Sequence, residues 1–234
     1  SRSNDHLLVN LDEHYDRTLG SRQIDCVVLG HEKMTQLFRD RPTTFKPQVI
    51  ETGAEWEMHN SLGAVRWAPP EITFSDEMEI HWETNTLLLE SRPGPSSAAI
   101  WAELPVEKIV FVGDAVVPNA PPFLSNANLP EWMDTLEILL KPEYRKYTLV
   151  SGRGGVIGHN DVKNQQKNLE KIARTVEKLG GKHFDPEEIN RTAQHFLKNF
   201  DVPKDREQQY FLRLRYGLTH YMRKQMGTVV ETFE

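Results

Sequence analysis

The segment between residues 6 and 20 constrains the fold more than any other part of the chain. It begins with a short apolar run at 6–11, which is typical of a strand, and continues into a polar loop that closes on Gly20. The ionisable side chains of this loop include the closely spaced Asp12, His14, Asp16 and Arg17. A second apolar run follows at 26–29. The pattern predicts a strand, a functional loop and a second strand, with the ionisable groups gathered at one strand end.

The middle of the chain predicts a sheet built from consecutive short strands. Turn residues separate five candidate strands, at 72–74, 78–82, 86–90, 98–101 and 108–112. Helix and strand then alternate, with helices expected at 130–140 and 162–179 and a strand at 147–150 between them. This order suits a layered α/β sandwich better than a doubly wound nucleotide-binding fold.

The sequence changes character after the glycine pair at 180–181. Asp185 is a good helix N-cap and Pro186 suits the first helical position, so a helix is expected to open there. A second helix is expected from about Pro203 to Met226, which completes a helical hairpin. We therefore divide the chain into a main domain at 1–182 and a C-terminal helical extension at 183–234.

The second helix of this hairpin has an apolar stripe and several basic residues. The stripe consists of Phe211, Leu214, Leu218 and Met222. We expect it to cover apolar surface of a short N-terminal sheet or to mediate homo-oligomerisation. The basic side chains are expected on a solvated face: Arg206, Arg213, Arg215, Arg223 and Lys224.

Composition narrows the possible partners and compartment. The 234 residues include 38% hydrophobic ones and carry a net charge of −6, which favours a globular acidic protein and argues against binding to nucleic acid. No apolar run is long enough to span a membrane. The lone cysteine, Cys26, lies in an apolar run and is expected to be buried and unreactive. The cytoplasm is the expected compartment.

Several further segments resemble the metallo-β-lactamase superfamily in the order that this family requires. The loop after the first strand resembles the family's His-x-His-x-Asp-His motif, and the segment 111–114 resembles its Phe-x-Gly-Asp motif. Residues 92–101 and 150–155 are similar to its Gly-His-Thr-x-Gly-Ser and Gly-His-Gly segments, and residues 122–129 also resemble this superfamily. The resemblance covers residues 6 to about 180 and implies a four-layer αββα sandwich. Only five residues precede the first strand, so either the chain is incomplete or its first sheet is shortened at the N-terminus.

The resemblance also indicates which metal ligands are kept and which are replaced. His14, Asp16 and Asp114 stand at ligand positions, whereas Asp12 and Arg17 replace histidines of the first motif. Likewise, Arg153 replaces the last histidine, and Pro93 or Pro95 stands where another is expected. The predicted ligand-binding site therefore consists of Asp12, His14, Asp16, Arg17, Asp114 and Arg153.

Two functions are compatible with this site. Guanidinium groups are permanently charged and bind carboxylates in a fork, so arginines are able to replace the metal charge. This favours a non-catalytic ligand-binding or interaction protein without a cofactor, whose cleft takes a small anionic ligand. The alternative is a hydrolase with one divalent metal, zinc, manganese or magnesium, held by Asp12, His14, Asp16 and Asp114.

Overall fold

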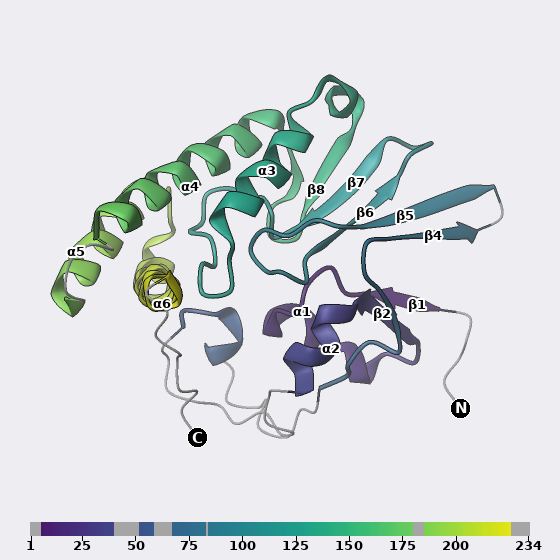
Figure 1. The fold of residues 1–234 in the computed structure, drawn as a ribbon, viewed down its shortest axis with the longest axis horizontal. Helices are drawn as coiled ribbons and strands as arrows, with labels where there is room; N and C mark the ends of the chain where they lie inside the picture. Colours follow the sequence, from purple (N-terminus) through teal and green to yellow (C-terminus); the bar gives the residue numbers. More distant parts are fainter. Residues whose placement is uncertain (1–5, 40–51, 59–66, 83, 180–184, 226–234) are drawn as a thin grey trace.

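The computed structural model describes residues 6–39, 52–58, 67–82, 84–179 and 185–225 (Figure 1). Its first sheet is three-stranded and parallel, in the order β1-β2-β3. The strands are β1 (Leu7–Val9), β2 (Val27–His31) and β3 (Ile72–Phe74). The loop after β1 contains two short helical turns, and a longer helix follows β2: α1 (Tyr15–Thr18), η1 (Ser21–Gln23) and α2 (Glu32–Arg39). The expected order of strand, loop and strand is therefore confirmed.

The second sheet is six-stranded and mostly antiparallel, in the order β4-β5-β6-β7-β8-β9. Its strands are β4 (Glu77–Trp82), β5 (Asn85–Ser91), β6 (Ile100–Leu104), β7 (Ile109–Gly113), β8 (Thr148–Ser151) and β9 (Gly155–Ile157). The expectation that residues 72–74 belong to the same sheet is wrong, because β3 pairs in parallel with β2. Strand β9 is not expected from the sequence, because Gly155 and Val156 are both exposed and its three residues show no useful periodicity.

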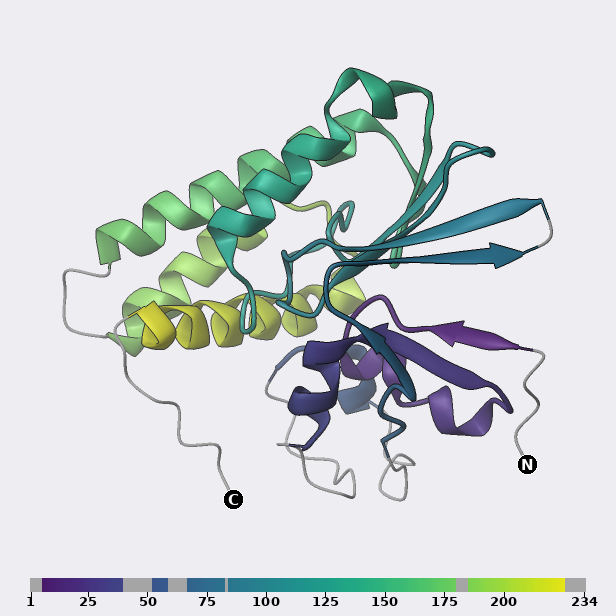
Figure 2. The same cartoon turned by 45° about the vertical axis from the view of Figure 1, so that its right-hand side comes forward.

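Alternation along the strands of the second sheet produces two cores. In β6, Ile100 and Ala102 face the first sheet and pack with Leu29 and Leu89, whereas Trp101 faces the opposite way. Trp101 belongs to the larger core under the long helices, with Val110 and other residues of β7 and β8. The two sheets therefore pack face to face, with helices outside them, and the predicted αββα sandwich is confirmed (Figure 2).

The four helices expected in the second half of the chain begin and end within a few residues of the expected positions. They are α3 (Leu129–Leu139), α4 (His159–Leu179), α5 (Pro186–Leu197) and α6 (Glu207–Gln225). Three short turns, η2 (Glu55–Met58), η4 (Pro142–Lys146) and η5 (Lys204–Arg206), are not expected from the sequence. The Asp185 carboxylate accepts a hydrogen bond from the amide of Glu187 at 2.9 Å, so this N-cap is confirmed. Helix α6 begins at Glu207, because residues 204–206 form a tighter 3-10 turn.

The C-terminal hairpin shares the larger core with α3 and α4. Leu214, Leu218 and Met222 are buried there together with Trp132 and Leu169, and Phe211 is partly buried against them. The apolar stripe is therefore covered within the chain and does not require a second copy. It packs beside α3, α4 and the second sheet, so the expected role in covering the first sheet is not observed for these four residues.

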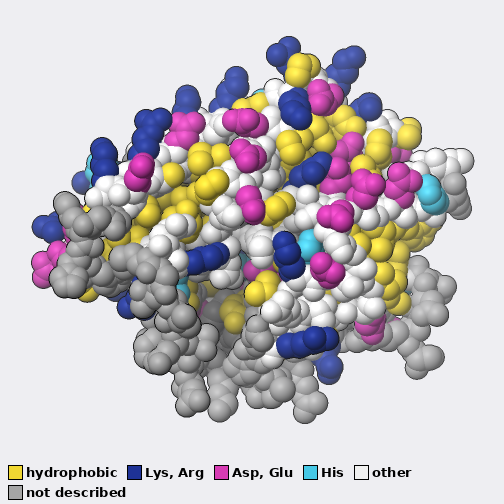
Figure 3. Space-filling view, viewed as in Figure 1, with side chains coloured by type: hydrophobic (Ala, Val, Ile, Leu, Met, Phe, Trp, Pro, Cys, Tyr) yellow, Lys and Arg dark blue, Asp and Glu magenta, His cyan; other side chains and the backbone are white. Residues whose placement is uncertain are grey.

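The surface carries both signs of charge. Figure 3 shows Lys and Arg side chains along α4, interspersed with Asp and Glu side chains. Cys26 is 1% exposed, as expected. None of the helices in the described part of the chain combines the length and apolar content needed to cross a bilayer.

Candidate functional site

The loop that follows β1 is held by hydrogen bonds between its own ionisable groups and its backbone. Asp12 is buried and its Oδ1 accepts a hydrogen bond from the backbone N–H of His14 at 2.8 Å. The imidazole Nδ1 of His14 accepts one from the amide of Asp16 at 3.4 Å and so caps α1. This cap sets the direction of α1, from which Asp16 and Arg17 extend.

Asp114 lies at the centre of the site and both of its carboxylate oxygens accept hydrogen bonds from arginines. The residue follows β7 directly after Gly113, whose φ of +56° suits glycine, and its side chain is 4% exposed. Arg17 donates from Nη2 to Oδ1, and Arg153 donates from Nε to Oδ2 at 2.8 Å. The strand ends of the second sheet therefore bring Asp114 and Arg153 to the loop that carries Arg17.

Arg153 joins three carboxylates from three parts of the chain. Besides Asp114, it donates from Nη2 to Oδ2 of Asp16 at 3.0 Å and from Nη1 to Oε2 of Glu55 at 2.7 Å. Its Nη2 also lies 3.4 Å from Nδ1 of His14. The side chain is only 12% exposed, so these ion pairs are largely shielded from water.

Gly152 leaves the space that this arrangement needs. A Cβ atom on Gly152 would lie 2.5 Å from Nη2 of Arg17 and 2.9 Å from Oδ1 of Asp114. Distances this short require the neighbours to move, and here the neighbours are the paired atoms themselves. Any larger residue at position 152 therefore conflicts with the pair between Arg17 and Asp114.

The structure adds Arg213 and Glu55 to the predicted site. Arg213 is 1% exposed, so the expectation that it lies on a solvated face of the last helix is wrong. Its Nη2 donates to Oε1 of Glu55 at 2.8 Å and to the carbonyl oxygen of Gly53 at 3.1 Å. The guanidinium carbon also lies 4.0 Å from the centroid of the Phe123 ring. The carboxylate of Glu55 thus bridges Arg153 and Arg213.

The sequence contains a usable signal for Arg213 but not for Glu55. Arg213 stands three residues after Tyr210 and four before Gly217, so the three residues share one face of α6. The structure shows that this face is buried. Glu55 had no such signal, because its position depends on a close approach between η2 and α6. A Cβ on Gly53, which has a φ of +68°, would lie 2.2 Å from the carbonyl oxygen of Gln209 on that helix.

Two other segments that resemble family motifs lie in different places: the one around Pro93 packs against α3, whereas 122–129 contributes Phe123 to the site. Pro93 accepts a hydrogen bond at its carbonyl oxygen from Oγ1 of Thr135 at 2.7 Å, which ties its segment to α3. The neighbouring Gly94 lies against the Trp132 ring, which a Cβ there would approach to 2.9 Å. Phe123, from the segment 122–129, lies inside the site, with its ring centroid 4.2 Å from that of His14.

Burial and charge shift the pKa values of the site in opposite directions. Burial, reinforced by Asp114 and Glu13, raises the pKa of Asp12 to about 7. Burial and a hydrogen bond with Glu55 raise the pKa of Asp16 to about 6. Burial also acts on Asp114, but Arg153 and Arg17 outweigh it and lower the pKa of that carboxyl group.

His14 and Glu55 shift downward. Burial and the charge of Arg153 lower the pKa of His14 well below its usual value, so its imidazole is neutral near pH 7. The hydrogen bond with Asp16 and the two arginines lower the pKa of Glu55 despite its partial burial. Near pH 7 the site therefore contains ionised arginines, ionised Asp114 and Glu55 and a neutral His14, whereas Asp12 is close to its own pKa.

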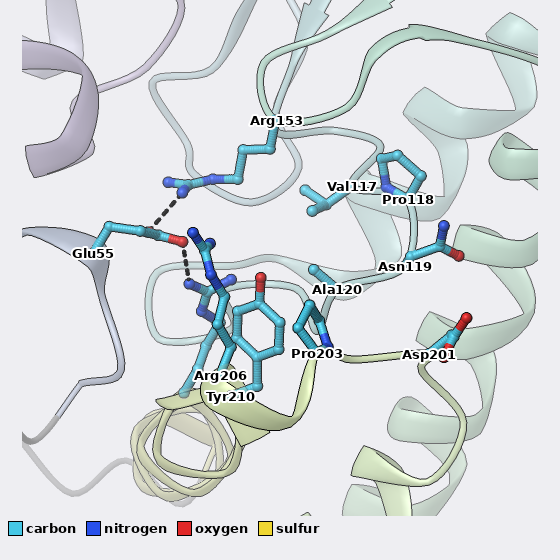
Figure 4. Close-up of a pocket in the computed structure, with 11 residues that line it drawn as sticks. Glu55, Val117, Pro118, Asn119, Ala120, Arg153, Asp201, Pro203, Arg206 and Tyr210 are labelled. Carbon is cyan, nitrogen blue, oxygen red and sulfur yellow. Dashed lines mark hydrogen bonds and ion pairs between the residues drawn. The ribbon is translucent and has the colours of Figure 1, made fainter. Parts of the chain in front are cut away.

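A cavity of about 430 Å³ opens beside this network (Figure 4). Glu55 and Arg153 line it on one side, together with Arg206 and Tyr210. Arg213 also lines the cavity. The loop that follows β7 forms the opposite wall with Val117, Pro118, Asn119 and Ala120. The site therefore offers ligand-sized space next to guanidinium groups.

The fold and the position of the site define a class of protein. Two face-to-face sheets flanked by helices carry the site at the strand ends, as in proteins of the metallo-β-lactamase fold. A profile of the metallo-beta-lactamase superfamily matches residues 17–175. The chain therefore belongs to the metallo-beta-lactamase superfamily.

Solved structures support the same fold. The chain is similar to a metallo-beta-lactamase family protein from Thermus thermophilus, with a TM-score of 0.61 and 14% identity over 94% of this chain and 75% of that one. It is also similar to a metallo-beta-lactamase from Pontibacter korlensis, with a TM-score of 0.51 and 18% identity over 69% of this chain and 67% of that one. No curated protein matches the chain.

Proposed function

We propose that this protein is a non-catalytic ligand-binding or interaction protein in which an arginine–carboxylate network replaces the metal centre of its superfamily. The observation that carries the proposal is the pairing of both carboxylate oxygens of Asp114 with arginines. Arg17 and Arg153 each donate a hydrogen bond to one of its two oxygens, so both oxygens face permanently charged donors. In the family motif, the aspartate at this position bridges two metals.

The other candidate ligands also fit a metal poorly. Nδ1 of His14 accepts a hydrogen bond from the Asp16 amide, and Asp16 itself is paired with Arg153. Asp12 accepts a hydrogen bond at Oδ1 from the backbone N–H of His14. Within the described ranges, no three His, Cys, Asp or Glu side chains are grouped so that they could hold a metal ion. These observations favour the salt-bridge network over a metal.

The alternative function is a metal-dependent hydrolase with a mononuclear site. It would use Asp12, His14, Asp16 and Asp114, which supply three carboxylates and one neutral imidazole. Its specific support is the neutral state of His14, since a metal binds unprotonated imidazole. Arg17 and Arg153 would first have to leave Asp114, which would leave two further positive charges beside the ion.

Metal content separates the two functions. The protein should be purified without added metal and analysed for zinc, manganese and magnesium, and its thermal unfolding midpoint should be measured with each ion added. A metal present at 100 times its Kd would stabilise the fold by about 2.7 kcal/mol, which is easily detected. We expect no stoichiometric metal and no shift of the midpoint.

A variant that restores family ligands provides the positive control. Arg17→His with Arg153→His returns two histidines to the positions where the superfamily motif has them. The midpoint of this variant is expected to rise when zinc is added. One or more tightly bound zinc ions per chain in the unmodified protein would refute the proposed function.

A further inference from the structure

We propose that the cavity beside the network binds a small organic anion through Arg206, Arg213 and Arg153, and that Glu55 competes with this anion from within the chain. This inference rests on the proposed ligand-binding function and names the ligand class, the contacting residues and an internal competitor. It begins from the charges that line the cavity. Three arginines line it, whereas Glu55 and Asp201 are its acidic lining residues among those described.

Arg206 is the arginine of the cavity lining that takes no part in the ion-pair network of the described residues. It belongs to the turn before α6, is exposed, and hydrogen-bonds with the side chain of Tyr210. No ion pair joins it to another residue in the described ranges, in contrast to Arg153 and Arg213. Figure 4 shows Arg206 and Tyr210 on the same side of the cavity as Glu55. An incoming anion would therefore meet a guanidinium group that retains unused donors.

Glu55 already occupies the position that an anionic head group would take. Its two oxygens each accept a hydrogen bond from a different arginine, Oε2 from Arg153 and Oε1 from Arg213. The side chain remains 30% exposed, so solvent and solutes reach it from the cavity. This is the geometry by which two guanidinium groups bind a free carboxylate or phosphate.

The segment around Glu55 is organised to hold this carboxylate in place. The buried carboxylate of Glu57 accepts hydrogen bonds from the amides of Thr52 and Gly53, each at 2.9 Å. The carbonyl oxygen of Gly53 in turn accepts from Nη2 of Arg213. These hydrogen bonds hold the segment 52–58 together and attach it to α6. Glu55 therefore stays close to the arginines and competes with a free anion at a high effective concentration.

The shape and chemistry of the cavity limit the size and class of the ligand. Its volume of about 430 Å³ suits a small organic molecule. Val117, Pro118, Ala120 and Pro203 provide an apolar wall, and Asn119 provides an amide. The ligand class is therefore a compact molecule with a carboxylate or phosphate head and a short, largely uncharged body.

Binding of inorganic phosphate and of succinate tests the inference and distinguishes the two head groups. Isothermal titration calorimetry should be run at constant ionic strength on the full chain. Arg206→Gln is expected to weaken binding about tenfold or more, as expected for the loss of one charge-assisted hydrogen bond. Glu55→Gln is expected to strengthen it by a similar factor, because the internal competitor loses its charge.

Matched variants control for general charge effects. Arg174→Gln removes an arginine that is 76% exposed on α4 and does not line the cavity, and Glu107→Gln removes an exposed glutamate between β6 and β7. Neither is expected to change the affinity. The double variant Glu55→Gln with Arg206→Gln should lose the gain seen in Glu55→Gln alone. Circular dichroism and thermal unfolding check that each variant is folded.

The results separate this inference from the proposed function. Binding that appears only in folded Glu55→Gln still supports the inference, since it shows competition by Glu55. Absence of binding in both the unmodified protein and Glu55→Gln, or equal losses in Arg206→Gln and Arg174→Gln, overturns it. Zinc should be measured in the same preparation: stoichiometric zinc with Arg206-dependent binding refutes only the proposed function, whereas metal-free protein without such binding refutes only the inference.

Discussion

Replacing Arg153 by alanine is expected to destabilise the fold more than any other single change in the network. Its guanidinium group donates to Asp114 at 2.8 Å, to Asp16 at 3.0 Å and to Glu55 at 2.7 Å. The substitution removes all three donors at once. Asp114, only 4% exposed, would then keep Arg17 as its arginine partner among the described residues, while Asp16 would lose its ion pair with Arg153.

The exposure of the partners sets the magnitude. Removing one partner of a buried ion pair typically costs about 3 to 5 kcal/mol, because an uncompensated charge remains in a poorly solvated position. Asp114 meets this condition, whereas Glu55 is 30% exposed and retains Arg213, so its share is small. We therefore expect a loss of roughly 3 to 5 kcal/mol for Arg153→Ala. Arg17 is 27% exposed and, in the described part of the chain, its ion pair is with Asp114, so Arg17→Ala should cost less, about 1 to 3 kcal/mol.

Urea unfolding followed by circular dichroism at pH 7 measures these free energies. Arg153→Met separates charge from packing, since the guanidinium carbon of Arg153 lies 4.9 Å from the centroid of the Phe123 ring. Methionine restores part of the packing, so its cost is expected to approach that of alanine if charge dominates. Arg174→Ala on the exposed face of α4 is the control and should change stability by less than about 0.5 kcal/mol. A loss below about 0.5 kcal/mol for both Arg153→Ala and Arg17→Ala would show that these arginines do not replace a buried metal charge.

Three further predictions concern pH, space and the hairpin. Because the pKa of Asp12 is raised to about 7 in the folded state, against about 3.9 in the unfolded chain, the stabilisation from this group is full below about pH 4 and lost as the pH rises toward 7. Asp12→Asn should therefore become progressively more stable than the unmodified protein over that range, and parallel pH profiles from urea unfolding would contradict the raised pKa. Gly152→Ala should destabilise the folded protein by about 1 to 3 kcal/mol, because the added methyl group displaces Arg17 from Asp114. Gly20→Ala is the control, because a Cβ there meets nothing within 4 Å, and equal unfolding midpoints for the two variants would disprove the steric conflict. Deletion of residues 185–234 should lower both the solubility and the thermal unfolding midpoint, because it exposes the core that the hairpin shares with α3 and α4. An unchanged midpoint and solubility, with an unchanged mass in sedimentation, would show that the hairpin contributes nothing to this core.

Local features of the fold follow directly from the sequence. The strand and loop at 6–20, the cap at Asp185 and the alternation of helix and strand after residue 108 depend on side-chain periodicity and capping, which act over a few residues. The order of the motifs also indicated the metallo-β-lactamase fold and, through that resemblance, placed Asp114 and Arg153 in one site. The structure confirms that the two residues meet, because they follow the neighbouring parallel strands β7 and β8.

Tertiary structure alone decided the rest. Whether residues 72–74 extend the first or the second sheet depends on which backbone they pair with, and three residues contain no information about that choice. Glu55 joins Arg153 across 98 positions in the sequence and Arg213 across 158. Such ion pairs have no local pattern, since they form only after η2 and α6 have packed together. The sequence alone therefore could not predict the charge balance of the site, because that balance depends on the packing that buries Arg213 and places Glu55 between two arginines.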